Sequence, residues 1–331
     1  MMMTQMPDVR LSRRAILGSF AAAVGAGSVA ACTPGSMTTP VRAFGPASVM
    51  PLGIQFYMLG AEPYKDLPGT FAKLAEMGYR QVEIPQITVK TAAATAKAAA
   101  DAGIAITSLH LNSGKLAPSA GLTLDSDPQQ IIDTMGILGT KLAVLPMTPL
   151  PASAKPGGAR PFQQMISEAL VAAGRDYWIA LAELLNQRAA LLAKGGIGLG
   201  YHNHNMEFAP VGDTTGWAIL VGRTDPKLVH FEVDIGWVQS AGLDPAAFIR
   251  ALGPRVRQLH LKDVAAGMPA NFALETKPTV AGTGVVDWPA VLRAARTAGV
   301  SHAYVEQEPP FDIPRMEAAR QSALFFSTLT I

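Results

Sequence analysis

Short runs of apolar residues recur along this 331-residue chain, with room for a helix between successive runs. The runs are rich in Val, Ile and Leu, and they are mostly continuous instead of alternating with polar residues. Continuous apolar strands are typical of a parallel sheet that helices cover on both faces. We therefore predict eight strands, at residues 52–57, 81–84, 104–111, 142–145, 197–201, 228–234, 256–261 and 303–306.

The segments between these runs carry helical patterns. Gly78 and Gly103 stand where two of the patterns stop, as expected for residues that end helices. The region 161–194 is long enough for one long helix or for two in succession. We predict helices at residues 67–77, 91–102, 128–138, 161–194, 215–221, 245–252, 288–298 and 314–329.

Eight strand–helix units in sequence define the predicted fold class. They indicate an α/β protein with a single (β/α)8 TIM barrel, covering residues 51–331. A doubly wound sheet is the alternative, but no Gly-x-Gly-x-x-Gly turn follows the first strand, which argues against a dinucleotide site. In a TIM barrel the active site lies at the C-terminal ends of the strands.

The N-terminal segment 1–31 has the features of an export signal. Ser12, Arg13 and Arg14 precede an apolar run and resemble a twin-arginine signal; that run is too short and too glycine-rich to favour a membrane span. The run ends in a lipobox-like sequence, so Cys32 would be acylated after cleavage and would anchor an exported, periplasmic protein in the membrane. The alternative is ordinary cleavage, which leaves Cys32 as a free thiol. Because Cys32 is the only cysteine, no intramolecular disulfide is possible.

Residues 32–50 are rich in Pro, Gly, Ser and Thr, and this composition predicts a flexible tether. Removal of residues 1–31 takes away three arginines and one aspartate, which leaves 24 basic and 24 acidic residues. A neutral chain without a basic stripe is a poor partner for nucleic acid.

Polar ligand-type residues gather where the predicted strands end. Four of the six histidines stand at C-terminal strand ends, whereas His230 and His302 stand at strand starts, where we expect structural roles. His202 and His204 are two residues apart, so a strand would point both to one face. They could equally be hydrogen-bonded histidines without a metal. Two imidazoles and two carboxylates from strands five to eight could surround one divalent cation, Mn²⁺, Co²⁺, Zn²⁺ or Mg²⁺.

The motifs at these strand ends resemble the xylose-isomerase-like TIM-barrel superfamily, and within it the sugar (phosphate) isomerase/epimerase branch. The likeness spans about residues 50–331 and is carried by residues 200–208 (GYHNHNMEF), 233–237 (VDIGW), 258–263 (QLHLKD) and 305–307 (VEQ). The resemblance implies one divalent metal, held by His202, Asp234, His260 and Glu306. Many epimerases of the superfamily have glutamate at the strand-five position, so His202 keeps a ligand but removes one proton-shuttling carboxylate.

The metal-bound reading implies enolisation of a sugar carbonyl, with Glu306 as the first candidate for the base and His204 as the second. Lys262 would stabilise the oxyanion or transfer protons, and Glu207 would orient an imidazole. Glu83 and His110 are candidate hydroxyl-binding groups, and Trp237 offers a flat face to a sugar ring. The structural alternatives are a paired Glu83, a His110 that satisfies a loop, and a Trp237 packed in the core.

The leading functional prediction is an exported, metal-dependent sugar isomerase or epimerase acting on an unphosphorylated small carbohydrate. A lyase that acts on a 3-keto-glycoside would use the same residues, and loss of the second carboxylate favours it mildly. A metal nuclease needs more ligands and a basic surface. The remaining alternative is a non-catalytic, sugar-binding surface lipoprotein.

Overall fold

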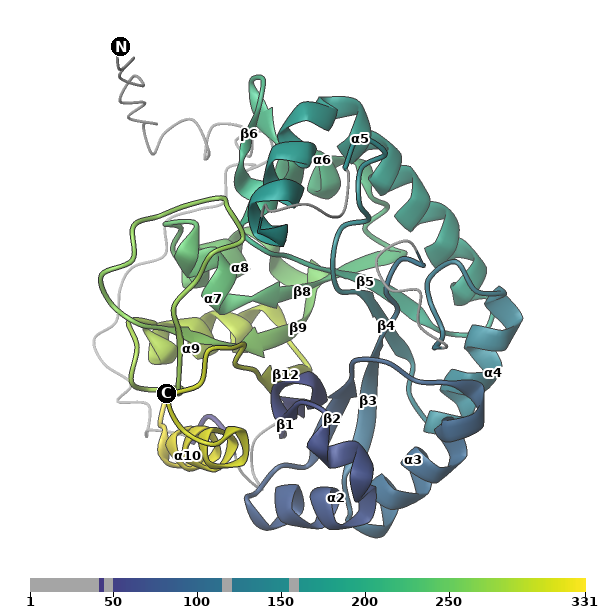
Figure 1. Cartoon of the computed structure of the whole chain (residues 1–331), viewed down its shortest axis with the longest axis vertical. Coiled ribbons are helices and arrows are strands. Elements are labelled where there is room, and N and C mark those ends of the chain that lie inside the picture. The colour runs from purple at the N-terminus through teal and green to yellow at the C-terminus, as the bar shows by residue number, and fades with distance from the viewer. Residues whose placement is uncertain (1–41, 45–49, 115–120, 155–160) are drawn as a thin grey trace, which may run out of the picture. The chain divides into compact units, whose positions relative to one another are not determined.

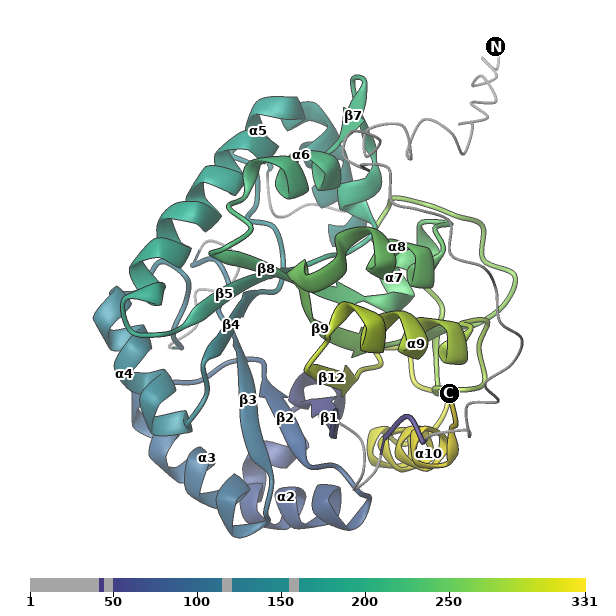
Figure 2. The ribbon, with the colours of Figure 1, turned by 180° about the vertical axis from the view of Figure 1, so that it is seen from behind.

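The computed structural model describes residues 42–44, 50–114, 121–154 and 161–331, and the predicted signal segment with Cys32 lies outside these ranges. Eight parallel strands form a closed barrel in which each strand pairs with the next along the chain and the last, β12, pairs with the first, β1 (Figure 1). Helices surround the barrel (Figure 2). The predicted single (β/α)8 TIM barrel is therefore confirmed.

The barrel strands agree closely with the predicted ones. Three have the predicted bounds, and the others differ by one or two residues at an end. The first strand ends early because residues Phe56–Leu59 turn into a 3₁₀ helix, whose first turn is capped by the side chain of Gln55. The strands are β1 (Leu52–Gln55), β2 (Gln81–Ile84), β3 (Ala105–His110), β4 (Leu142–Leu145), β5 (Gly198–His202), β8 (Val229–Asp234), β9 (Val256–Leu261) and β12 (His302–Val305).

The helices also follow the predicted order, with one addition. The long region, labelled α5, consists of two helical segments in succession that meet in a kink at Gly174, where φ is 68° and ψ is −158°. A helix of six residues, α7, directly follows β8 and was not predicted, because a segment this short with five buried residues shows no helical period. The helices are α2 (Leu67–Glu76), α3 (Val89–Asp101), α4 (Pro128–Leu138), α5 (Phe162–Ala193), α6 (Gly216–Arg223), α7 (Ile235–Ser240), α8 (Pro245–Leu252), α9 (Trp288–Ala298) and α10 (Arg315–Thr328).

Two small antiparallel ribbons lie outside the barrel. One joins β6 (Pro210–Val211) to β7 (Thr214–Thr215), and the other joins β10 (Asp263–Val264) to β11 (Pro278–Thr279). Asp263 closes the second ribbon: its carboxylate accepts hydrogen bonds from the amides of Gly282 and Gly284 and from the indole of Trp288. This buried carboxylate therefore stabilises the loop after β9.

The barrel interior is polar, although the strands that form it were predicted from apolar runs. Because successive residues of a strand face opposite sides, one apolar face packs on the helices while the other can carry polar groups. Fully buried polar side chains on the barrel strands are Gln55, Gln81, Glu83, Ser108, Glu232, Asp234, Gln258 and His260. Such a set costs free energy unless its members pair with one another.

Part of the predicted tether is packed. Arg42 forms a β-bridge with Thr330, and the ring of Phe44 lies edge-on to Phe326 of α10, with 5.5 Å between centroids. The structure does not describe residues 32–41 and 45–49, and for these residues the flexible tether stays a prediction. Within the described ranges, no helix combines the length and the apolar character that a membrane crossing requires.

Candidate metal centre and active site

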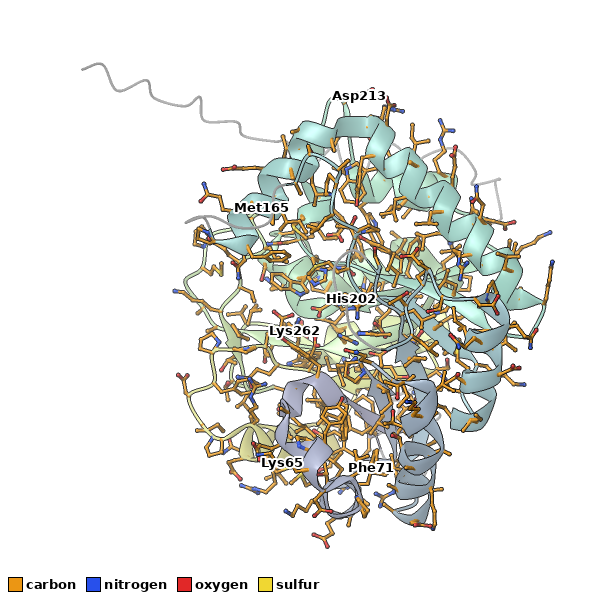
Figure 3. The ribbon with its side chains drawn as sticks, turned by 45° about the vertical axis from the view of Figure 1, so that its right-hand side comes forward. Lys65, Phe71, Met165, His202, Asp213 and Lys262 are labelled. Carbon is orange, nitrogen blue, oxygen red and sulfur yellow. The ribbon has the colours of Figure 1, made fainter. Side chains whose placement is uncertain are left out.

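The C-terminal strand ends bring the four predicted metal ligands together. His202 ends β5, Asp234 ends β8, His260 lies in β9 and Glu306 directly follows β12. Asp234 Oδ2 lies 3.8 Å from His202 Nε2 and 3.8 Å from His260 Nδ1. Glu306 Oε2 lies 3.0 Å from the same His260 nitrogen. Figure 3 labels His202 near the middle of the barrel.

The other nitrogen of each ligand histidine faces a buried carboxylate. His260 Nε2 lies 2.7 Å from Glu83 Oε2, and His202 Nδ1 lies 3.1 Å from Glu232 Oε2. Metal-binding histidines commonly donate their second N–H to a carboxylate, which fixes the orientation of the ring. The nitrogen and oxygen atoms that His202, Asp234 and His260 turn toward one another all lie within 4.8 Å. This buried cluster fits a divalent metal.

Glu232 is a functional candidate that the sequence analysis missed. It stands two residues before Asp234 and therefore points to the same interior face of the barrel. Its carboxylate lies within 3.2 Å of His110 Nε2 and of His260 Nε2, in addition to His202. The available signal was a carboxylate between Phe231 and Val233 in a buried strand, where an unpaired charge is expensive.

Glu83 and His110, the predicted hydroxyl-binding groups, belong to the same buried network. Glu83 accepts hydrogen bonds from Gln55 Nε2 at 2.7 Å and from the hydroxyl of Ser108, and His110 Nε2 lies 3.0 Å from it. Burial would raise the pKa of Glu83, but His110 and His260 outweigh burial and hold that pKa well below its usual range. Glu83 therefore pairs with histidines, not with the Lys or Arg expected in the alternative, and substrate contact remains a prediction for both residues.

Lys262 has its side chain completely buried among three carboxylates. Its Nζ lies 2.9 Å from Asp234 Oδ2, 3.0 Å from Glu306 Oε2 and 2.7 Å from Glu308 Oε1. Burial disfavours the charged amine, but these carboxylates outweigh it and raise the pKa of Lys262 well above its usual range. The group is thus an ammonium at neutral pH, which suits it to bind an oxyanion and not to act as a base.

Gly236 makes room for that lysine. A Cβ atom built at Gly236 would lie only 2.7 Å from Lys262 Cγ, closer than real Cβ contacts. The glycine in the first turn of α7 therefore lets the aliphatic stem of Lys262 lie flat against the helix. This explains a glycine two residues after Asp234 without invoking backbone flexibility.

His204, beside His202 and Trp237, has a ring nitrogen without a hydrogen-bond partner among the described residues. Its ring centroid lies 5.0 Å from that of His202 and 5.3 Å from that of Trp237. Nδ1 is buried and has no hydrogen-bond partner among the described residues. Burial, assisted by the nearby Lys262 ammonium, lowers the pKa of His204 to about 3, so its imidazole is neutral.

The remaining polar residues of the 200–208 motif hold neighbouring segments in place. Asn203 Oδ1 accepts a hydrogen bond from the amide of Asp234, and Asn205 Oδ1 accepts one from the amide of Leu274. Glu207 was predicted to orient an imidazole, and this is wrong. Its carboxylate instead accepts hydrogen bonds from the backbone amide of His204 and from the Tyr201 hydroxyl, because it lies over a backbone turn.

Trp237 lies against the reactive side chains. The Lys262 ammonium is 4.9 Å from the centroid of its ring, within the range of a cation–π contact. Only 2% of the residue is exposed, and its indole nitrogen has no hydrogen-bond partner among the described residues. Trp237 is thus largely packed, as in the structural alternative, yet it also lines a pocket at the barrel mouth.

Comparison with known families agrees with this fold. The family described as the xylose isomerase-like TIM barrel matches residues 71–329, and the chain belongs to this family. Solved structures extend the likeness over most of the chain. A sugar phosphate isomerase/epimerase from Parabacteroides distasonis covers 86% of this chain and 98% of its own, with a TM-score of 0.65 and 24% identity. The IolI protein with a bound zinc atom covers 82% and 95%, with a TM-score of 0.56 and 16% identity.

The curated relatives carry another name. An inosose dehydratase from Geobacillus thermodenitrificans is 32% identical over 155 residues, which are 42% of this chain and 50% of that protein. An inosose dehydratase from Clostridium beijerinckii is 26% identical over 128 residues, which are 36% and 42% of the two chains. The chain therefore spans about half or less of the length of the curated relatives it matches. Isomerase/epimerase neighbours and dehydratase relatives together leave the reaction type open within an enzyme superfamily.

Proposed function

We propose that this protein is a metal-dependent enzyme that removes the proton next to the carbonyl of an unphosphorylated keto sugar or cyclitol. One observation carries the proposal: two histidines with carboxylates on their far nitrogens face Asp234 beside a buried ammonium. His202, Asp234, His260 and Glu306 would hold the metal. A bound divalent cation acts as a Lewis acid, which polarises the carbonyl and stabilises the developing negative charge.

The side chains around the proposed metal site divide the proton transfers between them. His204 Nδ1 has no hydrogen-bond partner among the described residues and would accept the α-proton, with Glu306, the first candidate from the sequence, as the other acceptor. Lys262, held as an ammonium by three carboxylates, would stabilise the enediolate oxygen. Burial of all three groups excludes water that would otherwise protonate the enediolate.

The enediolate has two possible fates, and we infer elimination over reprotonation. In elimination the C–H electron pair forms the enediolate, the carbonyl then re-forms, and a β-substituent leaves with its electron pair and takes a proton to become a neutral product. An epimerase instead needs a second base on the other face, and strand five carries His202 where many epimerases carry glutamate. The inosose dehydratase relatives also support elimination, because a dehydratase expels water.

Charge at the barrel mouth supports the absence of a phosphate on the substrate. The pocket beside Trp237 is lined by three carboxylates, Glu168, Glu275 and Glu308, and by one ammonium, Lys277. A dianionic phosphate would meet net negative charge there, without an arginine to grip it. The isomerase or epimerase outcome stays as the second candidate, because its chemistry starts with the same proton removal.

The test is metal analysis of the purified protein, followed by incubation with keto sugars and inosose in D₂O. About one divalent ion per chain with deuterium entering next to the carbonyl supports enolisation, and a conjugated enone product then identifies elimination. Retention of the substrate with exchanged or inverted carbon identifies an epimerase. A metal-free protein that binds sugar without any exchange would contradict the proposal and leave the sugar-binding lipoprotein.

We further propose that the protein is exported by the twin-arginine route and anchored in the periplasm through an acylated Cys32. The support is the sequence alone. Fractionation of cells that express the full chain is the test, with mass analysis of the N-terminal peptide. Replacement of Arg13 and Arg14 by lysine should retain the protein in the cytoplasm, and Cys32→Ser should release it from membranes. Unchanged fractionation of both variants would contradict export and anchoring.

A further inference from the structure

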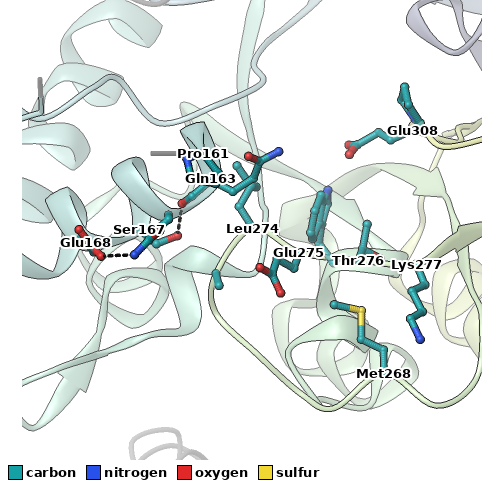
Figure 4. Close-up of a pocket in the computed structure, with 14 residues that line it drawn as sticks. Pro161, Gln163, Ser167, Glu168, Met268, Leu274, Glu275, Thr276, Lys277 and Glu308 are labelled. Carbon is teal, nitrogen blue, oxygen red and sulfur yellow. Dashed lines mark hydrogen bonds between the residues drawn. The ribbon is translucent and has the colours of Figure 1, made fainter. Parts of the chain in front are cut away.

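The pocket beside Trp237 adjoins the reactive cluster. It has a volume of about 710 Å³ and lies between the beginning of α5 and the loop that connects β10 to β11 (Figure 4). Pockets of roughly 300–1,000 Å³ bury ligands of drug size, which are larger than one sugar ring. The metal-ligand candidates do not line this pocket. It therefore adds space next to the proposed reaction site without being part of it.

Two residues connect the pocket to the reactive side chains. Trp237 lines the pocket, and its ring lies 5.3 Å from the ring of His204. Glu308 also lines the pocket, and its carboxylate accepts a hydrogen bond from Lys262 at 2.7 Å. A ligand that placed its reacting carbon beside Lys262 and His204 would thus extend past Trp237 into the pocket.

The lining of the pocket suits a sugar ring. Gln163, Gln164 and Ser167 line one side of the pocket from the first turns of α5. The Ser167 hydroxyl donates to the carbonyl of Gln163, and the Gln164 amide donates to Glu168 (Figure 4). Leu274 and Met268 supply apolar surface from the loop on the other side, and this loop also carries Thr276, whose hydroxyl is hydrogen-bonded to Ser240. Sugars present both C–H faces and hydroxyls, so a mixed wall of this kind matches them better than an apolar slot would.

The indole nitrogen of Trp237 is a second indication of a ligand. This N–H is buried and lacks a hydrogen-bond partner among the described residues, in a residue that is 2% exposed. A buried donor without an acceptor costs about 1–3 kcal/mol in general. A hydroxyl of a bound ligand would satisfy it.

The pocket wall is also held in a strained conformation. Leu274 has φ = 56°, which is uncommon for a residue with a branched side chain, and it is the one non-glycine residue with positive φ in the described ranges. Asn205, from the same motif as His202 and His204, holds it: Oδ1 accepts from the Leu274 amide, and Nδ2 donates to Asn271. Strain that surrounding contacts maintain is characteristic of ligand sites.

The geometry points to a substrate made of two linked units: the reacting keto ring lies over Lys262 and His204, and a second, uncharged sugar ring occupies the pocket of Trp237, Ser167 and Leu274. The leaving group of the elimination is then the second sugar, which departs as an alcohol after its glycosidic oxygen takes a proton. This inference rests on the proposed enolisation, because it assigns the substrate class of that reaction.

The test compares the metal-loaded protein on 3-ketoglucose and on a 3-keto disaccharide, by deuterium exchange next to the carbonyl and by release of the second sugar. We expect kcat/KM to be at least tenfold higher for the disaccharide. Ser167→Trp, which fills the pocket from α5, should lower that ratio to about one. Glu183→Trp is the matched control, since Glu183 is exposed on α5 beyond the kink, and it should leave both rates unchanged.

The outcomes separate the two proposals. Exchange on 3-ketoglucose with no advantage for the disaccharide would overturn the second-ring site and leave enolisation standing. Absence of exchange on both substrates would overturn enolisation and this inference with it. As a readout without turnover, calorimetry with the unoxidised disaccharide should detect binding to the parent protein that Ser167→Trp loses, and no binding to the parent would contradict the pocket assignment.

Discussion

The two ends of the barrel interior use the same side chain for different purposes. At the N-terminal end, His230 donates to the amide oxygen of Gln258 at 2.8 Å, and His302 donates to that of Gln81 at 2.7 Å. At the C-terminal end, His202 and His260 face the carboxylates of Glu232 and Glu83. The predicted structural role of His230 and His302 agrees with these amide partners.

The partner decides what each imidazole can do. Burial lowers the pKa of both N-terminal histidines, to about 4 for His230, where it outweighs the hydrogen bond to the Gln258 amide oxygen, which favours the charged ring only weakly. At the mouth, burial also disfavours the charged ring of His260, but Glu232 and Glu306 outweigh it and raise that pKa well above its usual range. A neutral network packs the barrel, whereas a charge-dense one can exchange a proton for a metal ion.

The two ends of the barrel should differ most when a candidate metal-binding residue at the C-terminal end is substituted. His260→Ala and Asp234→Ala should each lose the metal and lower kcat/KM by about a thousandfold or more, because a catalytic metal supplies several kcal/mol of transition-state stabilisation. Metal content by elemental analysis and far-UV circular dichroism are the measurements. His230→Gln, at the other end, should keep both the metal and the activity. Full activity in His260→Ala would remove the basis for the proposed site.

Substitution of the carboxylates that contact the far nitrogens of His202 and His260 should have the next largest effect. Glu232→Gln keeps the shape of the side chain but weakens its hold on His202, and we expect metal affinity to fall about 10- to 100-fold. Competition with a chromophoric chelator measures the affinity directly. Gln258→Glu is not a suitable control, because Gln258 donates a hydrogen bond to Glu232. The control is Gln81→Glu at the N-terminal end, where Gln81 contacts His302. Equal metal affinities in Glu232→Gln and the parent would contradict the orienting role.

A methyl group beside Lys262 should have a smaller effect. Gly236→Ala places a Cβ 2.7 Å from Lys262 Cγ, so the lysine must shift away from its carboxylates. We expect a loss of about 1–3 kcal/mol in unfolding free energy and a fall of about tenfold in kcat/KM. Gly222→Ala in α6 is the matched control, because a Cβ there has no neighbour within 4 Å. Thermal unfolding that does not distinguish the two variants would contradict the cradle assigned to Gly236.

The smallest effect concerns the N-terminal end and acts on stability alone. Burial lowers the pKa of His230 from 6.5 to about 4, so the unfolded chain binds more protons between those values and stability falls as the pH falls through them. The contribution should amount to about 2 kcal/mol between pH 7 and pH 5. Urea unfolding of His230→Gln should show a correspondingly flatter pH dependence. An unchanged slope would mean that His230 is charged in the folded state.

Sequence patterns were sufficient to predict the barrel and to place the candidate metal ligands at its C-terminal end, for physical reasons. Buried strands need continuous apolar residues, and polar groups at their ends stand out against that background, as His202 and Asp234 do. Glu232 was missed because it lies within a strand, where its pairing with histidines from β3, β5 and β9 depends on barrel closure. The roles of Asn205 and Glu207 were also unpredictable, because both depend on contacts with backbone amides.

The kink at Gly174 divides α5 into two parts, of which only the first contributes to the pocket beside Trp237. Residues after it, such as Trp178, Leu185 and Leu192, are buried and belong to the hydrophobic core around the barrel. Residues before it supply Gln163, Gln164 and Ser167 to the wall of the pocket beside Trp237, while Ile166 and Leu170 pack in the core. Exchange of the exposed residues of 162–173 between relatives would therefore change which ligands the pocket accepts, while the candidate ligands on the barrel strands stay the same.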